Sequence, residues 1–133
     1  MSGFVDNGGC FVCGPKNPVG LKLDFHFSAP GFSAETELTF PSHFQGWDQV
    51  IHGGLLATVL DEVMVKAASS RDMACVTGEM TIKYLRPASP DTPYRLRGVV
   101  TTERGKLLTA EGTITDKDET VIAKASAKLI RVG

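Results

Sequence analysis

The chain has 133 residues, of which 42% are hydrophobic, 22% charged and 8% aromatic, a composition typical of one folded domain and not of a disordered chain. Lys and Arg number 14 against 15 Asp and Glu, so the formal net charge of −1 provides no general attraction to nucleic acid or to an anionic membrane. No apolar run approaches the roughly 18 residues of a membrane span, and the N-terminus lacks the features of a secretory leader. We therefore expect one cytoplasmic domain over residues 1–133, without nucleic-acid or membrane partners.

The first 20 residues are rich in Gly, Pro and Cys and contain the pair Cys10 and Cys13 at C-x-x-C spacing. Three cysteines in a cytoplasmic domain are expected to be free thiols. The pair can form a turn, half of a zinc site shared with a partner chain, or a redox pair. Because it runs directly into Gly14-Pro15 and no second short pair of ligands follows, we predict a turn that binds no metal and is dispensable for chemistry. The remaining ligand types are isolated: His26, His43, His52 and Cys75.

Hydrophobic periodicity predicts the elements in chain order. Residues 21–28 and 32–40 alternate apolar and polar side chains around Pro30-Gly31, which predicts a β-hairpin. Residues 41–52 have no period and mix aromatic, polar and Gly or Pro residues, which is typical of a functional loop. From Gly53 to about Ser70, helical spacing places six residues on one apolar stripe: Leu56, Val59, Leu60, Val63, Met64 and Ala67.

Beyond the break at Arg71-Asp72, period-two patterns predict four more strands, at about 74–86, about 93–104, 107–115 and 120–132. The order is thus β-β-α-β-β-β-β. Short turns between consecutive strands favour antiparallel pairing, and a lone apolar helix must be buried against the concave face of the resulting sheet. The sequence predicts an α+β fold.

The triplet His52-Gly53-Gly54 stands where the loop becomes the helix. The first N–H groups of a helix lack intrahelical acceptors, and glycine allows a carbonyl or phosphate oxygen to come close to them. This is the layout of an oxyanion hole. A plain helix start with tight packing is the alternative.

Two acidic residues follow on the helix, and their helical faces predict different roles. Glu62 shares its face with Lys66 one turn later, which predicts an ordinary exposed ion pair. Asp61 shares its face with Gly54, Ala57 and Ala68, all small, so this side of the helix can approach a ligand or a second helix closely. A carboxylate among small and apolar neighbours must be paired, hydrated or used, and we interpret Asp61 as a functional acid.

The run from His52 to Asp61 resembles the H-G-G-(six residues)-D/E signature of hotdog-fold acyl-CoA thioesterases, especially the phenylacetyl-CoA thioesterase type. The element order agrees with that fold, in which an antiparallel sheet wraps a central helix, and the resemblance covers about residues 20–132. The segment Tyr84-Leu85-Arg86-Pro87-Ala88 resembles the Y-x-x-P segment of the family, and residues 10–21 resemble a prefix found in a bacterial subset of it.

The resemblance implies roles for individual residues. The Gly53 N–H would polarise the thioester carbonyl, Asp61 would activate water or attack as a nucleophile, His52 would support the carbonyl site, and Thr77 would place a hydroxyl near the acid. Relatives often carry Asn where this chain has Gly46, and we expect Gln49 to take over that role, ahead of Gln45 or Asp48. From the residues themselves, we expect Gly54, Trp47, Lys83 and Arg86 to contact substrate. The alternatives are that the loop around Trp47 simply closes over the core and that Lys83 and Arg86 belong to a solvated face.

We therefore expect an acyl-CoA thioesterase that uses neither metal nor bound cofactor, with coenzyme A as part of the substrate. The alternatives are an acyl-thioester hydratase or dehydratase of the same fold, and a non-catalytic acyl-thioester-binding or structural protein. Because Gly54 and Asp61 lie about 10 Å apart along one helix, we further expect a homodimer, or a dimer of such dimers, with an active site shared between two chains.

Overall fold

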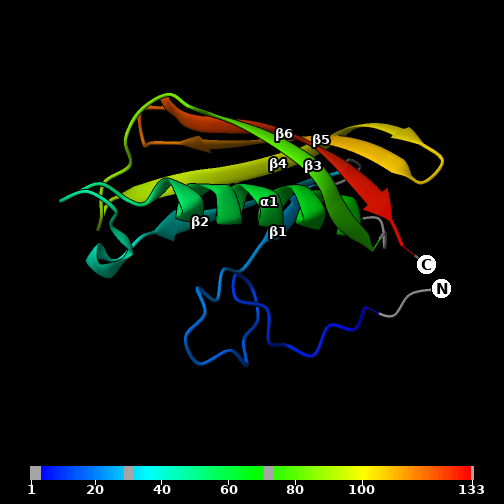
Figure 1. Cartoon of the computed structure of the whole chain (residues 1–133), viewed down its shortest axis with the longest axis horizontal. Helices are drawn as coiled ribbons and strands as arrows, with labels where there is room; N and C mark the ends of the chain where they lie inside the picture. The colour runs from blue at the N-terminus through cyan, green and yellow to red at the C-terminus, as the bar shows by residue number, and fades with distance from the viewer. Residues whose placement is uncertain (1–3, 29–31, 71–73, 133) are drawn as a thin grey trace.

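The computed structural model of the chain describes residues 4–28, 32–70 and 74–132. One long helix, α1 (Gly53–Ser69), packs on one face of a six-stranded antiparallel sheet (Figure 1). The loop before α1 contains one turn of 3-10 helix, η1 (Ser42–Phe44). The strands are β1 (His26–Ser28), β2 (Ser33–Thr39), β3 (Cys75–Tyr84), β4 (Pro93–Arg104), β5 (Leu107–Thr115) and β6 (Val121–Arg131). This confirms the predicted α+β class and the predicted element order.

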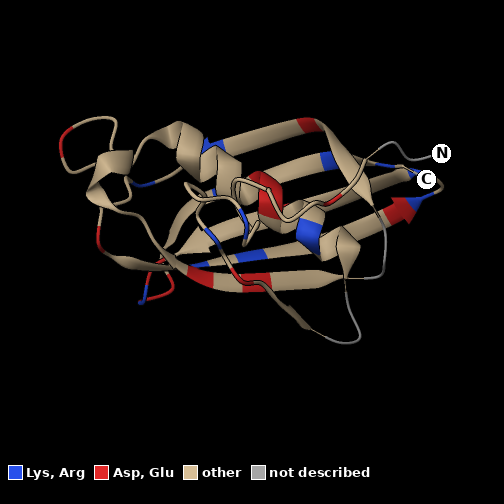
Figure 2. Cartoon of the chain, turned by 90° about the horizontal axis from the view of Figure 1, so that it is seen from below, with Lys and Arg blue, Asp and Glu red and all other residues tan. Residues whose placement is uncertain are grey.

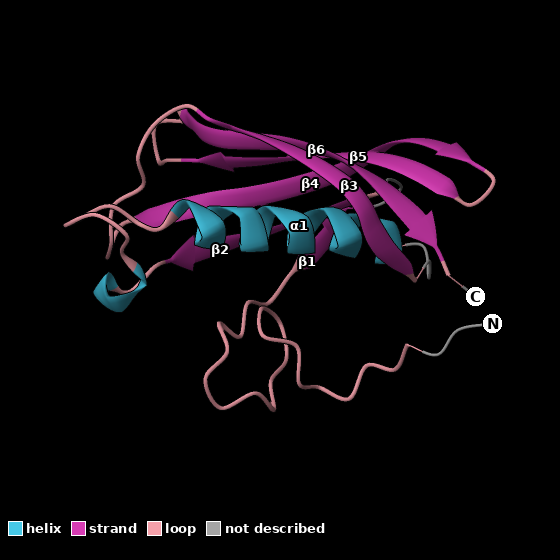
Figure 3. Ribbon diagram, viewed as in Figure 1, coloured by secondary structure: helices cyan, strands magenta, loops and turns pink. Residues whose placement is uncertain are grey.

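The strands lie in the order β1-β2-β4-β5-β6-β3 across the sheet (Figure 3). Strands β4, β5 and β6 pair as consecutive hairpins, and Gly105, with a φ of +62°, forms the tight turn between β4 and β5. Strand β3 follows the helix and pairs with β6, so its other side is an open edge of the sheet. The described residues contain no helix that is both long and apolar enough to cross a membrane.

The core lies between α1 and the concave face of the sheet. All six residues of the predicted apolar stripe are buried, as is Ala68. The helix packs tightly on two glycines that face each other in register, Gly98 on β4 and Gly112 on β5. A Cβ atom at Gly98 would lie 2.6 Å from the carbonyl oxygen of Val63. Glycine at position 98 thus sets the distance between helix and sheet.

The predicted first strand, 21–28, is wrong over most of its length, since β1 contains only His26–Ser28. The N–H groups of Leu21 and Leu23 donate to the carbonyls of Phe11 and Val12 instead of to β2. Between them Lys22 has a φ of +55°, which a regular strand does not allow. The period-two pattern there reflects pairing with the preceding segment, which the sequence pattern could not distinguish from sheet pairing.

The N-terminal segment, residues 4–25, has no helix or strand of its own and crosses α1 on the side opposite the sheet (Figure 1). Val12 is buried in the core, so this segment closes the open side of the helix. The other predicted elements agree with the structure to within about two residues at each end. The predicted turn at Pro30-Gly31 and the break at Arg71-Asp72 lie outside the described residues.

The contact at Gly98 predicts that two single substitutions, one at each glycine, differ in their effect on stability. Gly98→Ala should lower the free energy of unfolding by about 1–3 kcal/mol, because the new methyl group meets rigid helix backbone. Gly112→Ala should cost less, because its methyl group meets side-chain atoms of Leu60 and Met64, each 3.3 Å away, which can move. Urea denaturation of both variants measures the difference. Equal stabilities of the two variants would contradict this account of the packing.

Candidate functional site

The first turn of α1 is capped by a side chain. His52 is the N-cap residue, and its Nδ1 accepts a hydrogen bond of 2.9 Å from the Gly54 N–H. The His52 carbonyl accepts from the N–H of Leu55 at 2.9 Å. Within the described residues, the Gly53 N–H is left without an acceptor. The cap therefore leaves one free donor at the positive end of the helix, and that donor belongs to Gly53.

A pocket of about 570 Å³ opens at this end of the helix. Three segments form it: the loop before the helix, the first turn of α1, and the chain after β3. Its walls are largely apolar, and the lining residues are Gly46, Trp47, Val50, Ile51, His52, Gly53, Leu56, Tyr84, Leu85, Arg86, Pro87 and Ala88. This size and character suit a small organic ligand or the end of a larger one.

Tyr84 holds the Gly53 peptide in place. Its hydroxyl donates a hydrogen bond of 3.0 Å to the Gly53 carbonyl, which links the end of β3 to the start of α1. The sequence alone assigns Tyr84 no role in the site, although Tyr84 stands in the segment that resembles the Y-x-x-P segment of the family. The bond forms between residues 31 apart in the chain, so only the fold brings the two groups together.

Asp61 lies two turns further along α1, half-buried, and accepts a hydrogen bond from the Thr77 hydroxyl on β3. The ladder between β3 and β6 shifts its register between Thr77 and Glu79, which leaves Gly78 as an extra residue. Bulges of this kind re-aim neighbouring side chains and occur often beside functional sites. The structure thus brings together Asp61 and Thr77, the two residues that the resemblance had placed near each other.

Several expected residues line the pocket and others do not. Gly53, His52, Trp47 and Arg86 are in its wall, and Trp47 is 83% exposed at the rim. Gln49 is exposed and outside the lining, and its own N–H donates to the side chain of Gln45.

Three further residues, Lys83, Gly54 and Ala68, lie in surroundings that differ from those expected. Lys83 lies in a separate groove with Thr81 and Lys124. The Gly54 N–H is taken by His52. Ala68 is fully buried in the core and therefore cannot form a small face for a second helix, which corrects that expectation.

Charged residues of both signs are interspersed over the side that carries the N-terminal segment (Figure 2). On α1 the acidic pair at 61–62 is followed by Lys66 one turn later. The predicted ion pair between Glu62 and Lys66 is wrong, because the two described side chains do not approach within salt-bridge distance. Glu62 points instead toward the N-terminal segment.

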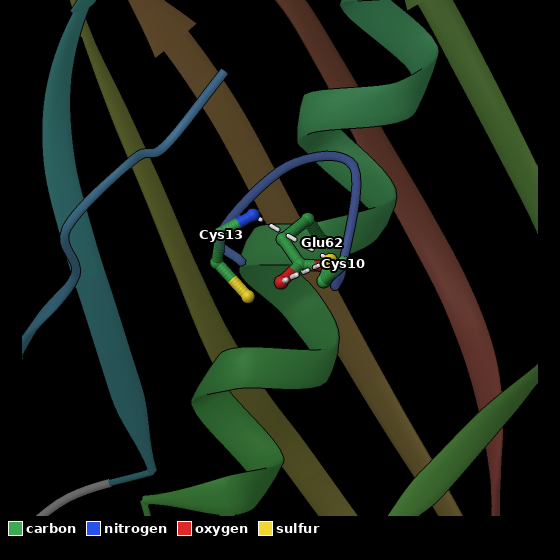
Figure 4. A group of neighbouring side chains, drawn as sticks. All are labelled: Cys10, Cys13 and Glu62. Carbon is green, nitrogen blue, oxygen red and sulfur yellow. Dashed lines mark hydrogen bonds between the residues drawn. The ribbon is translucent and has the colours of Figure 1, made fainter. Parts of the chain in front are cut away.

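The partners of Glu62 are the two cysteines of the C-x-x-C turn (Figure 4). The Cys10 thiol lies 3.8 Å from each carboxylate oxygen of Glu62, and the turn itself is closed by a hydrogen bond from the Gly14 N–H to the Cys10 carbonyl. Burial, together with hydrogen bonding to Glu62 and its negative charge, raises the pKa of Cys13 to about 12. Cys13 is therefore a neutral thiol at pH 7, which is unfavourable for nucleophilic redox chemistry.

Comparison with solved structures gives the same fold. A crystal structure of a thioesterase superfamily protein aligns with a TM-score of 0.86 and 24% identity, covering 92% of this chain and 60% of the other. The chain thus spans less than two thirds of that protein. The PaaI protein of E. coli, from the phenylacetic acid degradation operon, aligns with a TM-score of 0.78 and 23% identity, covering 85% and 81%.

A third neighbour, smu.793 from Streptococcus mutans, was solved bound to acetyl CoA. It aligns with a TM-score of 0.77 and 18% identity, covering 84% of this chain and 89% of the other. A search of curated protein sequences finds no match. The sequence model of the thioesterase superfamily matches residues 48–123, more than half of the chain, and this stretch contains the His52-Gly53-Gly54 turn, Asp61, Thr77 and Tyr84. The chain has the hotdog fold and belongs to the thioesterase superfamily.

Proposed function

We propose that the protein is an acyl-CoA thioesterase, which hydrolyses an acyl thioester to the free acid and coenzyme A. The observation that carries the proposal is the free N–H of Gly53 in the wall of the pocket, at the N-terminus of α1. A fixed donor at a helix N-terminus stabilises negative charge that develops on a carbonyl oxygen during attack. Membership of the thioesterase superfamily supports thioester chemistry at this position.

In the proposed reaction the thioester carbonyl oxygen accepts a hydrogen bond from Gly53, and Asp61 supplies the carboxylate. Acting as a base, Asp61 takes a proton from water while the water oxygen bonds to the carbonyl carbon. The C–S bond then breaks, and the proton passes to the departing sulfur. Acting as a nucleophile, the same carboxylate bonds to the carbon while the C–S bond breaks and the coenzyme A thiolate leaves. Water then hydrolyses the resulting anhydride, which releases the free acid, restores the Asp61 carboxylate and supplies the proton that the thiolate takes up. The Thr77 hydroxyl orients one carboxylate oxygen and leaves the other for the substrate in either case.

The pocket also supports the choice of substrate. Val50, Ile51 and Leu56 provide apolar surface for the acyl group, and Arg86 provides a cation in the wall for a phosphate of coenzyme A. Lys83 does not line this pocket, and we propose for it a contact with a more distant phosphate of coenzyme A. The acetyl CoA bound by the neighbour from S. mutans supports this class of ligand.

His52 is less suited to the alternative hydratase reaction, which needs a histidine that moves protons. Its Nδ1 is already the acceptor of the helix cap, which fixes the ring in a supporting role.

We also propose that the active unit is a homodimer in which each site combines two chains. Asp61 is absent from the lining of the pocket that contains Gly53. Eight residues of helix separate the two, about 12 Å along the axis, so one carbonyl group cannot easily contact both. A second copy that supplies its own Asp61 would complete the site.

The open edge of β3 offers a way to place that copy. Tyr84, at one end of β3, contacts Gly53, whereas Thr77, near the other end, contacts Asp61. If β3 pairs antiparallel with β3 of a second copy about an axis near Met80 and Thr81, Thr77 of one chain lies opposite Tyr84 of the other. Each Asp61 then approaches the Gly53 of the other chain, and the free edge is covered.

Replacing the acid tests the chemistry. Asp61→Asn keeps the shape of the side chain but removes the base, so we expect kcat for acyl-CoA hydrolysis to fall by about 100-fold or more with the fold intact. Release of the coenzyme A thiol measures the rate, and chromatography of the acyl product distinguishes hydrolysis from hydration. The matched control is Glu111→Gln, an exposed acid on β5, which should retain full activity. Undiminished hydrolysis by Asp61→Asn would contradict the assignment.

Mixed dimers test the shared site. Gly53→Pro removes the N–H at the first helical position, where proline is tolerated, and the ψ of 131° at His52 suits a residue before proline. Asp61→Ala and Gly53→Pro should each be inactive, whereas the two refolded together should regain about a quarter of wild-type activity, because half of random dimers contain one intact site. Gly53→Ala keeps the N–H and adds a methyl group at ordinary contact distance, 3.4 Å, from the Tyr84 ring, so it should retain clearly more activity than Gly53→Pro.

Circular dichroism must first show that the proline variant folds. Heterodimers that form but remain as inactive as their parents would show that each site comes from one chain. In that case the dimer proposal fails, while the role of Asp61 is still judged by the asparagine variant alone.

A further inference from the structure

The C-x-x-C turn and Glu62 form a second cluster that the proposed hydrolysis does not use. One Sγ atom from each cysteine and one carboxylate oxygen of Glu62 all lie within 4.8 Å of one another (Figure 4). The ligand atoms come from two segments 52 residues apart in the chain, the N-terminal segment and the middle of α1. All three side chains are half-buried. Thiolate and carboxylate together are ligands that zinc accepts.

The distances between the ligand atoms agree with tetrahedral coordination of zinc. Zinc bonds sulfur at about 2.3 Å and carboxylate oxygen at about 2.0–2.2 Å, so tetrahedral angles place the sulfur and oxygen ligands about 3.6 Å apart. The Cys10 sulfur lies 3.8 Å from each oxygen of Glu62. Small side-chain rotations therefore suffice for the three groups to share one ion.

The turn also provides hydrogen-bond donors for a sulfur ligand. The N–H groups of Val12 and Cys13 point at the Cys10 sulfur, at 3.4 and 3.5 Å. Donors of this kind stabilise and tune a sulfur atom once it is bound to a metal ion. The backbone of the turn thus provides two donors to the Cys10 sulfur as a metal ligand.

The charges around the cluster balance with a divalent cation. Two thiolates, the Glu62 carboxylate and Zn²⁺ sum to −1, and the ammonium group of Lys66, one helical turn after Glu62, brings the total to zero. A half-buried cluster is least costly when it is neutral overall. The two thiol protons are displaced when the ion binds.

We propose that Cys10, Cys13 and Glu62 bind one zinc ion, with a water molecule in the fourth position, and that this ion fastens the N-terminal segment to α1. The expectation of no metal rested on the lack of a further ligand close to the C-x-x-C pair in sequence. The fold brings Glu62, which is distant in the sequence, beside the cysteines as the further ligand. The Cys10–Glu62 contact lies across the open side of the helix, so metal binding joins the segment to the core where it has no helix or strand of its own.

Metal titration of the full-length protein tests the proposal. After chelator treatment under reducing conditions, the protein should bind one equivalent of Zn²⁺ and release about two protons per ion. Co²⁺ in its place should produce sulfur-to-metal charge-transfer absorption. The melting temperature should rise by roughly 5 °C or more when Zn²⁺ is well above its Kd.

The variants are chosen in pairs. The double variant Cys10→Ser, Cys13→Ser should lose the stoichiometric zinc, and Glu62→Gln should weaken binding by about 10-fold or more. Cys75→Ser changes the third cysteine, and Asp61→Asn changes the neighbouring carboxylate on the same helix; both should bind zinc as the wild type does.

Three results would overturn the proposal. The first is wild-type protein that binds less than one equivalent of Zn²⁺, a measurement that needs no variant to fold. The second is zinc that survives loss of both cysteines, and the third is a Cys10–Cys13 disulfide, seen as a mass lower by two hydrogens, as the stable state under reducing conditions.

Discussion

Burial of the apolar stripe of α1 against the concave face of the sheet is the contact on which the other features depend. It fixes both the position of the helix and its rotation about its own axis, because the stripe can face the sheet in one way only. Gly98 allows the helix backbone to come close enough for the stripe to be buried. Once the stripe faces the sheet, the direction of each remaining helix side chain is determined.

Neighbouring acids on the helix then face different partners. Successive residues are rotated by about 100°, so Asp61 turns toward the edge strand β3 and meets Thr77, whereas Glu62 turns toward the N-terminal segment and meets Cys10. One helix therefore carries two separate polar sites on two flanks of its buried stripe. The adjacent carboxylates can be altered independently, and each is a matched control for the other.

The start of the helix combines several contacts around one free donor, the Gly53 N–H. A helix N-terminus presents several unsatisfied N–H groups, and His52 takes the one at Gly54. The Tyr84 hydroxyl holds the Gly53 carbonyl, which belongs to the same peptide group as the Gly54 N–H. The peptide group that contains the free Gly53 donor is held through its His52 carbonyl, which accepts from the Leu55 N–H. A donor held in this way needs little reorganisation when charge develops on a substrate oxygen. The same strand that ends at Tyr84 carries Thr77, so one edge strand supports both the donor and the acid.

By itself the sequence determined most of the secondary structure and the class of the fold, because hydrophobic periodicity records which faces are buried. It also located the His52-Gly53-Gly54 turn and Asp61, since backbone donors at a helix start and a carboxylate among small residues are local features. It could not separate the strand pattern of residues 21–25 from pairing with the N-terminal segment, because both produce a period of two.

Only the tertiary structure decided which groups meet across long separations in the chain. In the described part of the chain the Glu62 carboxylate lies beside the two cysteines and forms no salt bridge with Lys66. The Tyr84 hydroxyl donates to the Gly53 carbonyl, and Gln49 lies outside the pocket. Ala68 is buried in the core. Helical spacing shows which residues share a face, but the partner of that face depends on how distant segments pack, and no local pattern contains that information.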